Sequence, residues 1–158
     1  MRFLGDVNRD GLALSAAIVE AIVAHARDEL PNEACGLIGG DLATGRATRY
    51  HPARNALASR YAYEVEASDL IRIMYAIEAD GDALVAIVHS HPATPATPSA
   101  SDVRGAAYPV VHVIVTLADP AAPTLRGWRI EPGAVREVPL RIEAAQQSPT
   151  VRWSTISR

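Results

Sequence analysis

The stretch that decides the fold is HSHPATPATPSASD, residues 89–102, which follows the apolar run LVAIV, residues 84–88. In an extended chain, side chains two positions apart point to the same side, so His89 and His91 project together. Pro92 disfavours a helical conformation for the residue before it and supports this extended geometry. Two imidazoles that converge at the end of a strand provide half of a zinc site.

A third ligand is expected at the far end of the same stretch. Pro92, Pro95 and Pro98 stiffen the loop, which can turn back on itself. A catalytic zinc usually takes three protein ligands and leaves the fourth position to water, and Asp102 is the natural third ligand. Ser99 and Asp102 have the spacing of a helix start. Separately, a histidine at a strand end and a capping box are usually structural, but together they make three candidate ligands.

Two amphipathic helices are expected to flank a sheet. The first is capped by Ser15 and runs to about Glu29, where Pro31 stops it. The second is capped by Ser68 and ends just before Gly81. The side chains expected on the buried stripes are Ile18, Ile22, Ala26 and Leu30 in the first helix and Leu70, Ile73, Met74 and Ile77 in the second.

Alternating and apolar segments predict the strands. They are residues 34–41, 46–55, 60–66, 83–88 and 110–117, followed by a hairpin around Pro132 and Gly133. Pro52 indicates an edge or a bend. The runs 83–88 and 110–117 are apolar on both faces, which is typical of central strands covered on both sides. The order of elements indicates an α/β fold, a single-domain mixed β-sheet flanked by helices.

The bulk composition excludes several classes of protein. With 158 residues and a net charge of −3, the chain has no basic field, so nucleic acid is a poor candidate partner. No apolar run approaches the roughly 20 residues that a membrane helix needs. The single cysteine, Cys35, rules out an intrachain disulfide, reads as a core residue and fits a cytoplasmic protein. We expect one domain over residues 12–143 and a polar tail over residues 144–158.

A hydrolytic zinc site also needs a base for its water, commonly a carboxylate that later protonates the leaving amine. Ligand spacing alone does not identify that carboxylate. On this ground six glutamates are possible: Glu20, Glu29, Glu33, Glu64, Glu66 and Glu78.

The long motif resembles that of the JAMM (MPN+) metallopeptidases, a glutamate at an early strand followed by His-x-His-x7-Ser-x2-Asp. Glu33, His89, His91, Ser99 and Asp102 fill every position of that pattern. The resemblance implies a cytidine-deaminase-like fold with one catalytic zinc ion held by His89, His91 and Asp102. It also implies that Glu33 is the general acid and base and that the Ser99 hydroxyl donates to the oxyanion.

The resemblance covers roughly residues 12–140 and also implies a substrate class. Members of the family cut amide bonds after the C-terminal Gly-Gly of ubiquitin and ubiquitin-like proteins. The short chain looks most like small prokaryotic members that act on ubiquitin-like sulfur-carrier proteins, including carrier–cysteine adducts. Such tails bind as an added strand, and residues 60–66, with Tyr61 and Tyr63 on one face, are the expected edge. An ordinary aromatic strand is the alternative interpretation.

Three other functions stay open. A non-catalytic scaffold of the same fold would lack metal ligands, whereas this chain has a full set. A DNA-repair-associated relative and a phage-tail-type cell-wall peptidase share parts of the motif, but each usually carries an additional module. His112, on an apolar strand, is expected either to pack in the core or to lie behind the ligands.

Overall fold

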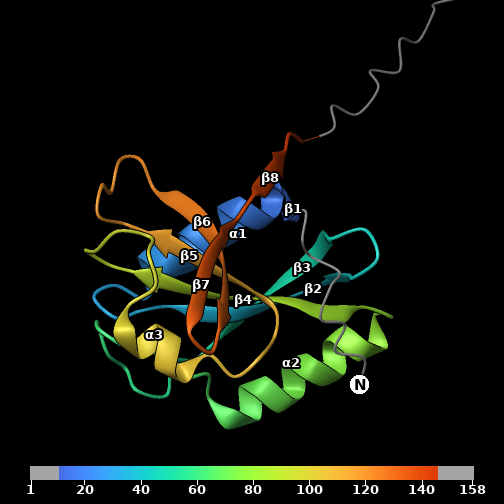
Figure 1. Ribbon diagram of the computed structural model, residues 1–158, viewed down its shortest axis with the longest axis horizontal. Helices are drawn as coiled ribbons and strands as arrows, with labels where there is room; N and C mark the ends of the chain where they lie inside the picture. Colours follow the sequence, from blue (N-terminus) through green and yellow to red (C-terminus); the bar gives the residue numbers. More distant parts are fainter. Residues whose placement is uncertain (1–10, 146–158) are drawn as a thin grey trace, which may run out of the picture.

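The computed structural model describes residues 11–145, which form an eight-stranded mixed sheet flanked by helices (Figure 1). This confirms the predicted fold class. The predicted tail, residues 144–158, lies outside the described residues except for its first two positions. In chain order the elements are β1 (Leu12–Ser15), α1 (Ala16–Asp28), β2 (Cys35–Asp41), β3 (Arg46–Ala53), α2 (Ala67–Ala79), β4 (Ala83–His91), α3 (Ala100–Gly105), β5 (Val111–Thr116), β6 (Thr124–Glu131), β7 (Ala134–Val138) and β8 (Leu140–Glu143).

The strands lie in the order β7-β6-β5-β4-β2-β3-β1-β8, so β4 is central, as predicted. It pairs antiparallel with β2 and parallel with β5, and its last eight residues are buried. β7 and β8 stand at opposite ends of this order although only Pro139 separates them in the chain. The Leu12 N–H donates to the Pro139 carbonyl at 3.0 Å, which continues the pairing of β1 with β8.

Each face of the sheet is covered by its own helix, and Figure 1 shows α1 and α2 on opposite sides. Ile18 and Ile22 of α1 pack in one apolar cluster with Val85 and Val88 of β4. Buried side chains of α2 pack with the opposite face of the sheet. The pairing of β2 with β4 shifts next to Val85, which has no partner in β2. Such a bulge reverses the faces to which later side chains point.

The helix predictions are confirmed except at two positions. Ser15 caps α1, and its hydroxyl accepts from the Ile18 N–H at 3.2 Å. Leu30 was expected on the buried stripe, but α1 ends at Asp28 and Leu30 is exposed. The expected cap at Ser68 is also wrong, because the Glu66 carboxylate accepts from the Asp69 N–H and α2 begins two residues earlier. None of the described helices is long and apolar enough to cross a membrane.

The expected strand at residues 60–66 is also wrong. Its only strand-like pairing in the described structure is an isolated bridge between Asn55 and Val65. The Asn55 side chain makes the hydrogen bonds that a neighbouring strand would otherwise make, and the segment stays irregular. At Pro52, β3 pairs with β2 on one side and has no strand partner on the other, because β1 pairs with β3 only at Arg46. The missing N–H of this proline is therefore not needed by the sheet.

Candidate metal centre

The two strand-end histidines point to the same side of β4 and converge with one carboxylate. His89 and His91 follow the bulge and face the side of the sheet that α2 covers, since Ile87, two residues earlier, packs in the α2 cluster. Their Nε2 atoms are 3.2 Å apart. The Asp102 Oδ2 atom lies 3.2 Å from the first and 3.1 Å from the second. All three residues are buried.

The donor set fits a zinc ion. Tetrahedral zinc with bonds of about 2.0–2.1 Å holds its ligand atoms about 3.3–3.4 Å apart, close to the three separations observed here. Burial holds the pKa of His89 below its ordinary value, which favours the neutral imidazole that a metal requires. The two histidine Nε2 atoms within 3.2 Å outweigh the burial of Asp102 and keep its pKa well below the usual range, so it is a carboxylate.

The proline-rich loop fixes the orientation of the second histidine. His91 Nδ1 lies 2.7 Å from the Pro95 carbonyl, which leaves Nε2 free to act as a ligand. The loop itself is held against the sheet at two points. The Trp128 Nε1–H donates to the Ala96 carbonyl at 2.9 Å, and the Thr116 hydroxyl donates to the Thr94 carbonyl at 2.6 Å.

Asp102 is both the candidate ligand and part of a capping box. Its Oδ2 accepts from the Ser99 N–H at 2.8 Å, while the Ser99 hydroxyl accepts from the Asp102 N–H at 3.1 Å. The Ser99 and Ser101 hydroxyls lie 3.0 Å apart. The structural and functional interpretations of this spacing are therefore compatible, since the cap holds the carboxylate on the first turn of α3.

Of the six glutamates that ligand spacing left open, Glu33 is the one that is buried, with 4% of its surface exposed. It precedes β2, and the Ser90 N–H donates to the Ala34 carbonyl, which places Glu33 level with the end of β4. Among residues 11–145 its Oε2 atom has no hydrogen-bond partner. Burial raises the pKa of Glu33 to about 7, against the opposing effect of His91. A buried carboxylate with that pKa is suited to exchange protons near neutrality.

Two polar residues that the sequence interpretation did not single out fix the backbone of Glu33. The Ala34 N–H donates to the Ser90 hydroxyl at 2.7 Å. The Asn55 Nδ2 donates to the Glu33 carbonyl at 3.1 Å. Ser90 lies between the two histidines of the motif, so its place next to the site could have been inferred from the sequence. No sequence pattern indicated that Asn55 would contact Glu33.

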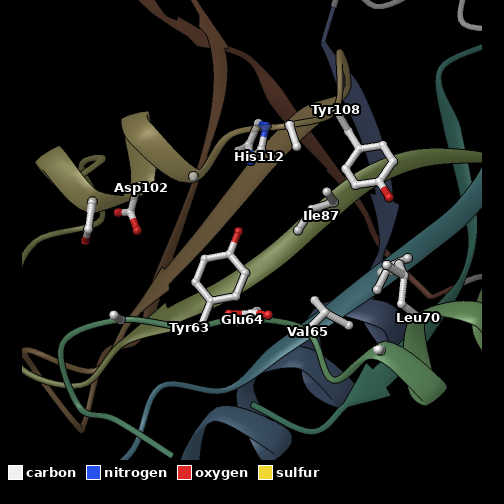
Figure 2. A pocket seen from close by; sticks show the side chains of 14 residues that line it. Tyr63, Glu64, Val65, Leu70, Ile87, Asp102, Tyr108 and His112 are labelled. Carbon is white, nitrogen blue, oxygen red and sulfur yellow. The ribbon is translucent and has the colours of Figure 1, made fainter. Parts of the chain in front are cut away.

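A cavity of about 460 Å³ adjoins the candidate centre at Asp102 (Figure 2). Tyr63, Ile87 and Leu70 line it, and its surface is mainly apolar. The Tyr63 ring also stacks on the His89 ring. Tyr61, the other tyrosine expected to bind substrate, is not among the lining residues and is 76% exposed.

The two remaining candidate groups, Cys35 and His112, are buried near the site. Cys35 pairs with His89 in the sheet, and burial raises the pKa of its thiol to about 12, so the expected core role is confirmed. His112 lies on β5 and lines the cavity. Burial lowers the pKa of His112 to about 4, although a hydrogen bond with the Tyr108 backbone opposes that shift. His112 is therefore a neutral imidazole next to the cavity.

The chain is similar to known proteins over most of its length. The family described as prokaryotic homologs of the JAB domain matches residues 15–131. The CysO-cysteine peptidase of Mycobacterium tuberculosis is 39% identical over 132 residues, which cover 83% of this chain and 90% of the relative. The desampylase of Haloferax volcanii is 38% identical over 103 residues, covering 62% and 74%. A protein of Desulfitobacterium hafniense with a solution structure superposes with a TM-score of 0.79 at 32% identity, over 85% of this chain and 94% of that one.

Proposed function

The chain belongs to the prokaryotic JAB branch of the JAMM family, and from this premise we propose that it is a zinc metallopeptidase. Its proposed reaction is hydrolysis of the amide bond that follows the C-terminal Gly-Gly of a ubiquitin-like sulfur-carrier protein. The observation that carries the proposal is the convergence of His89, His91 and Asp102 within ligand distance of one another, together with a buried Glu33 whose Oε2 atom has no hydrogen-bond partner among residues 11–145. A non-catalytic scaffold would not require three converging metal ligands and a buried carboxylate.

Each residue of the site has a proposed role in amide hydrolysis. His89, His91 and Asp102 hold zinc, which when bound supplies a Lewis acid that polarises a carbonyl and acidifies water. Glu33 takes a proton from the attacking water and delivers it to the departing amine, a role for which its raised pKa is suited. The Ser99 hydroxyl donates a hydrogen bond to the oxyanion that forms at the substrate carbonyl.

The cavity beside Asp102 is the proposed channel for the carrier tail. Its walls come from residues 62–65 on one side and from α2 on another, and its surface is mainly apolar. A tail that ends in two glycines is narrow and has no side chains to clash with such walls. The tail can therefore run along an irregular wall, whereas an added strand would need the regular edge that residues 60–66 do not form.

Two relatives support a protein of this class as partner. One is the CysO-cysteine peptidase of Mycobacterium tuberculosis, and the other, from Thermus thermophilus and 35% identical over 104 residues, is named a probable TtuB-protein conjugate cleaving protease. We assign the metallopeptidase domain to residues 12–143, because β1 begins at Leu12 and β8 ends at Glu143. The phage-tail-type peptidase is less well supported, since the matching phage tail tip assembly protein aligns over only 32% of its own length.

The proposal is tested with a ubiquitin-like carrier whose C-terminal Gly-Gly is joined to cysteine, followed by mass spectrometry of the carrier. Wild type with zinc should release the carrier with a free Gly-Gly terminus. Glu33→Gln should keep zinc and slow release about 10²–10⁴-fold, because the proton carrier is lost.

Glu20→Gln is the matched control, since Glu20 is an exposed carboxylate of α1, which covers the opposite face of the sheet. It should cleave at nearly the wild-type rate. Equal rates for wild type and Glu33→Gln would refute the assigned base. A wild type that cuts a cell-wall peptide and leaves the carrier adduct intact would refute the substrate class.

A further inference from the structure

The two candidate histidine ligands differ in what holds their rings. A metal-ligating histidine usually donates its second ring N–H to a carbonyl or carboxylate, and this fixes the ring orientation. His91 follows this rule through the Pro95 carbonyl. His89 does not, because its Nδ1 atom is buried and has no hydrogen-bond partner in the part of the chain that the structure describes. The orientation of the His89 ring needs another source.

Tyr63 makes the contact that can replace the missing hydrogen bond. Its ring stacks on His89 with centroids 4.4 Å apart and planes inclined by 19°. Rotation of an imidazole about χ2 is otherwise broad, and a stacked ring blocks it. Figure 2 shows Tyr63 rising from its segment into the cavity beside Asp102. Building on the proposed metallopeptidase function, we propose that Tyr63 is a positioning residue that holds His89 in its ligating orientation.

Tyr63 lies outside any helix or strand, and Asn55 contributes to its position together with a backbone hydrogen bond from the Ala56 N–H to the Glu64 carbonyl. The Asn55 Nδ2 donates to the Ala62 carbonyl at 3.1 Å, and its Oδ1 accepts from the Glu64 N–H at 3.1 Å. The residues on both sides of Tyr63 are thus held by one amide side chain. The same Nδ2 donates to the Glu33 carbonyl. Asn55 therefore ties the segment that braces one ligand to the backbone of the proposed base.

This role differs measurably from that of a tyrosine that only lines the cavity. A lining residue would change the KM for the carrier and leave the zinc affinity unchanged. Tyr108 provides the comparison, because it lines the same cavity and its backbone contacts His112 rather than a ligand. Tyr108→Leu is therefore the matched control for Tyr63→Leu.

The test is a zinc titration of the metal-free full chain against a chromogenic chelator, with no substrate present. Tyr63→Leu removes the planar contact and should weaken zinc binding about ten-fold, the low end for loss of a group that orients a ligand. Tyr63→Phe keeps the ring and should bind zinc like wild type, and so should Tyr108→Leu. Asn55→Ala should weaken binding in the same direction as Tyr63→Leu. The visible absorption of the Co²⁺-loaded protein should change in Tyr63→Leu and not in Tyr63→Phe.

Circular dichroism and thermal melting show whether each variant folds. If Tyr63→Leu does not, Tyr63→Met fills similar space without a planar face and gives the same comparison. Equal zinc affinity in wild type and the Leu or Met variant overturns the role of Tyr63, whether or not wild type cleaves the carrier adduct. Weakened zinc binding in the variant, with a wild type that cleaves no adduct, supports the role of Tyr63 and counts against the proposed substrate instead.

Discussion

Two regions meet at the candidate centre, and they are held in different ways. The ligand region, residues 83–102, consists of β4, the proline-rich loop and the start of α3. The cover segment, residues 54–66, lies between β3 and α2 and carries Tyr63. Sheet pairing on both sides and a capping box hold the ligand region. The cover segment is held by the Asn55 side chain and by a few single hydrogen bonds, among them those of the Ala56 N–H to the Glu64 carbonyl and of the Glu33 N–H to the Ser59 carbonyl.

The two regions therefore have different expected roles: the ligand region binds the metal, and the cover segment shapes the surroundings of the metal site. The ligand region contributes all three candidate ligand atoms, and its strand is paired with a neighbouring strand on each side. The cover segment contributes one wall of the cavity and a ring that stacks on a ligand. Changes in the ligand region should therefore abolish the centre, whereas changes in the cover segment should tune it. Substitutions at Ser99 and at Asp69 are expected to have smaller effects than loss of a ligand.

The largest effect is expected from His89→Ala in the ligand region. Bound zinc should fall from about one ion per chain to nearly none, because only two protein ligands remain. Cleavage of the carrier adduct should fall below detection together with the metal. Zinc content by atomic absorption and cleavage by mass spectrometry measure the two losses.

Ser90→Ala is the control for that change, because Ser90 lies between the two ligands and faces away from them. Its hydroxyl accepts from the Ala34 N–H, so the variant should lose stability by about 1–3 kcal/mol from the unpaired buried group. It should keep its zinc. Loss of zinc in Ser90→Ala as large as in His89→Ala would contradict the distinction between ligands and supports.

The same two regions explain how far the sequence could predict the structure. In the ligand region the information is local: alternation places two histidines together, prolines stiffen the loop, and the Ser99–Asp102 spacing marks a helix start. In the cover segment, alternation predicted a strand where none forms. There several of the hydrogen bonds come from the Asn55 side chain, whose partners in space no local pattern reveals. The stacking of Tyr63 on His89 was hidden for the same reason.

Ser99→Ala tests whether the Ser99 hydroxyl acts in catalysis as well as in capping α3. The variant should retain zinc, because the three ligands remain. Turnover should fall about 10²-fold if the hydroxyl steadies the oxyanion. Loss of the helix cap should also lower the free energy of unfolding by about 1 kcal/mol.

Ser99→Gly separates these two effects, because glycine at a helix cap costs only a few tenths of a kcal/mol relative to serine. Slow turnover in both variants would assign the loss to the hydroxyl. Normal turnover in the glycine variant would leave Ser99 with a structural role alone. Ser101→Ala, which removes the neighbouring hydroxyl, should have little effect on either measurement.

The smallest effect is expected where Arg54 of the cover segment contacts Asp69 of α2. This contact should make the free energy of unfolding depend on pH. Asp69 accepts from the Arg54 N–H at 2.9 Å and from the Arg54 guanidinium at 3.1 Å, and these bonds lower the pKa of its carboxyl to about 2. A carboxyl whose pKa is lower in the folded chain stabilises the fold above its unfolded pKa of about 4, and this contribution disappears as the pH falls through about 2.

Urea unfolding of wild type and Asp69→Asn between pH 2 and 6 measures this contribution. Above pH 5 wild type should be more stable by about 1–2 kcal/mol, less than the full shift implies because Arg54 is largely exposed and solvent screens the pair. The gap should narrow steadily below pH 4. Amide exchange should show residues 54–66 opening in acid before β4 does, since the two regions do not share this anchor. A constant gap down to pH 2, or simultaneous opening of both regions, would show that the cover segment is not held separately from the ligand region.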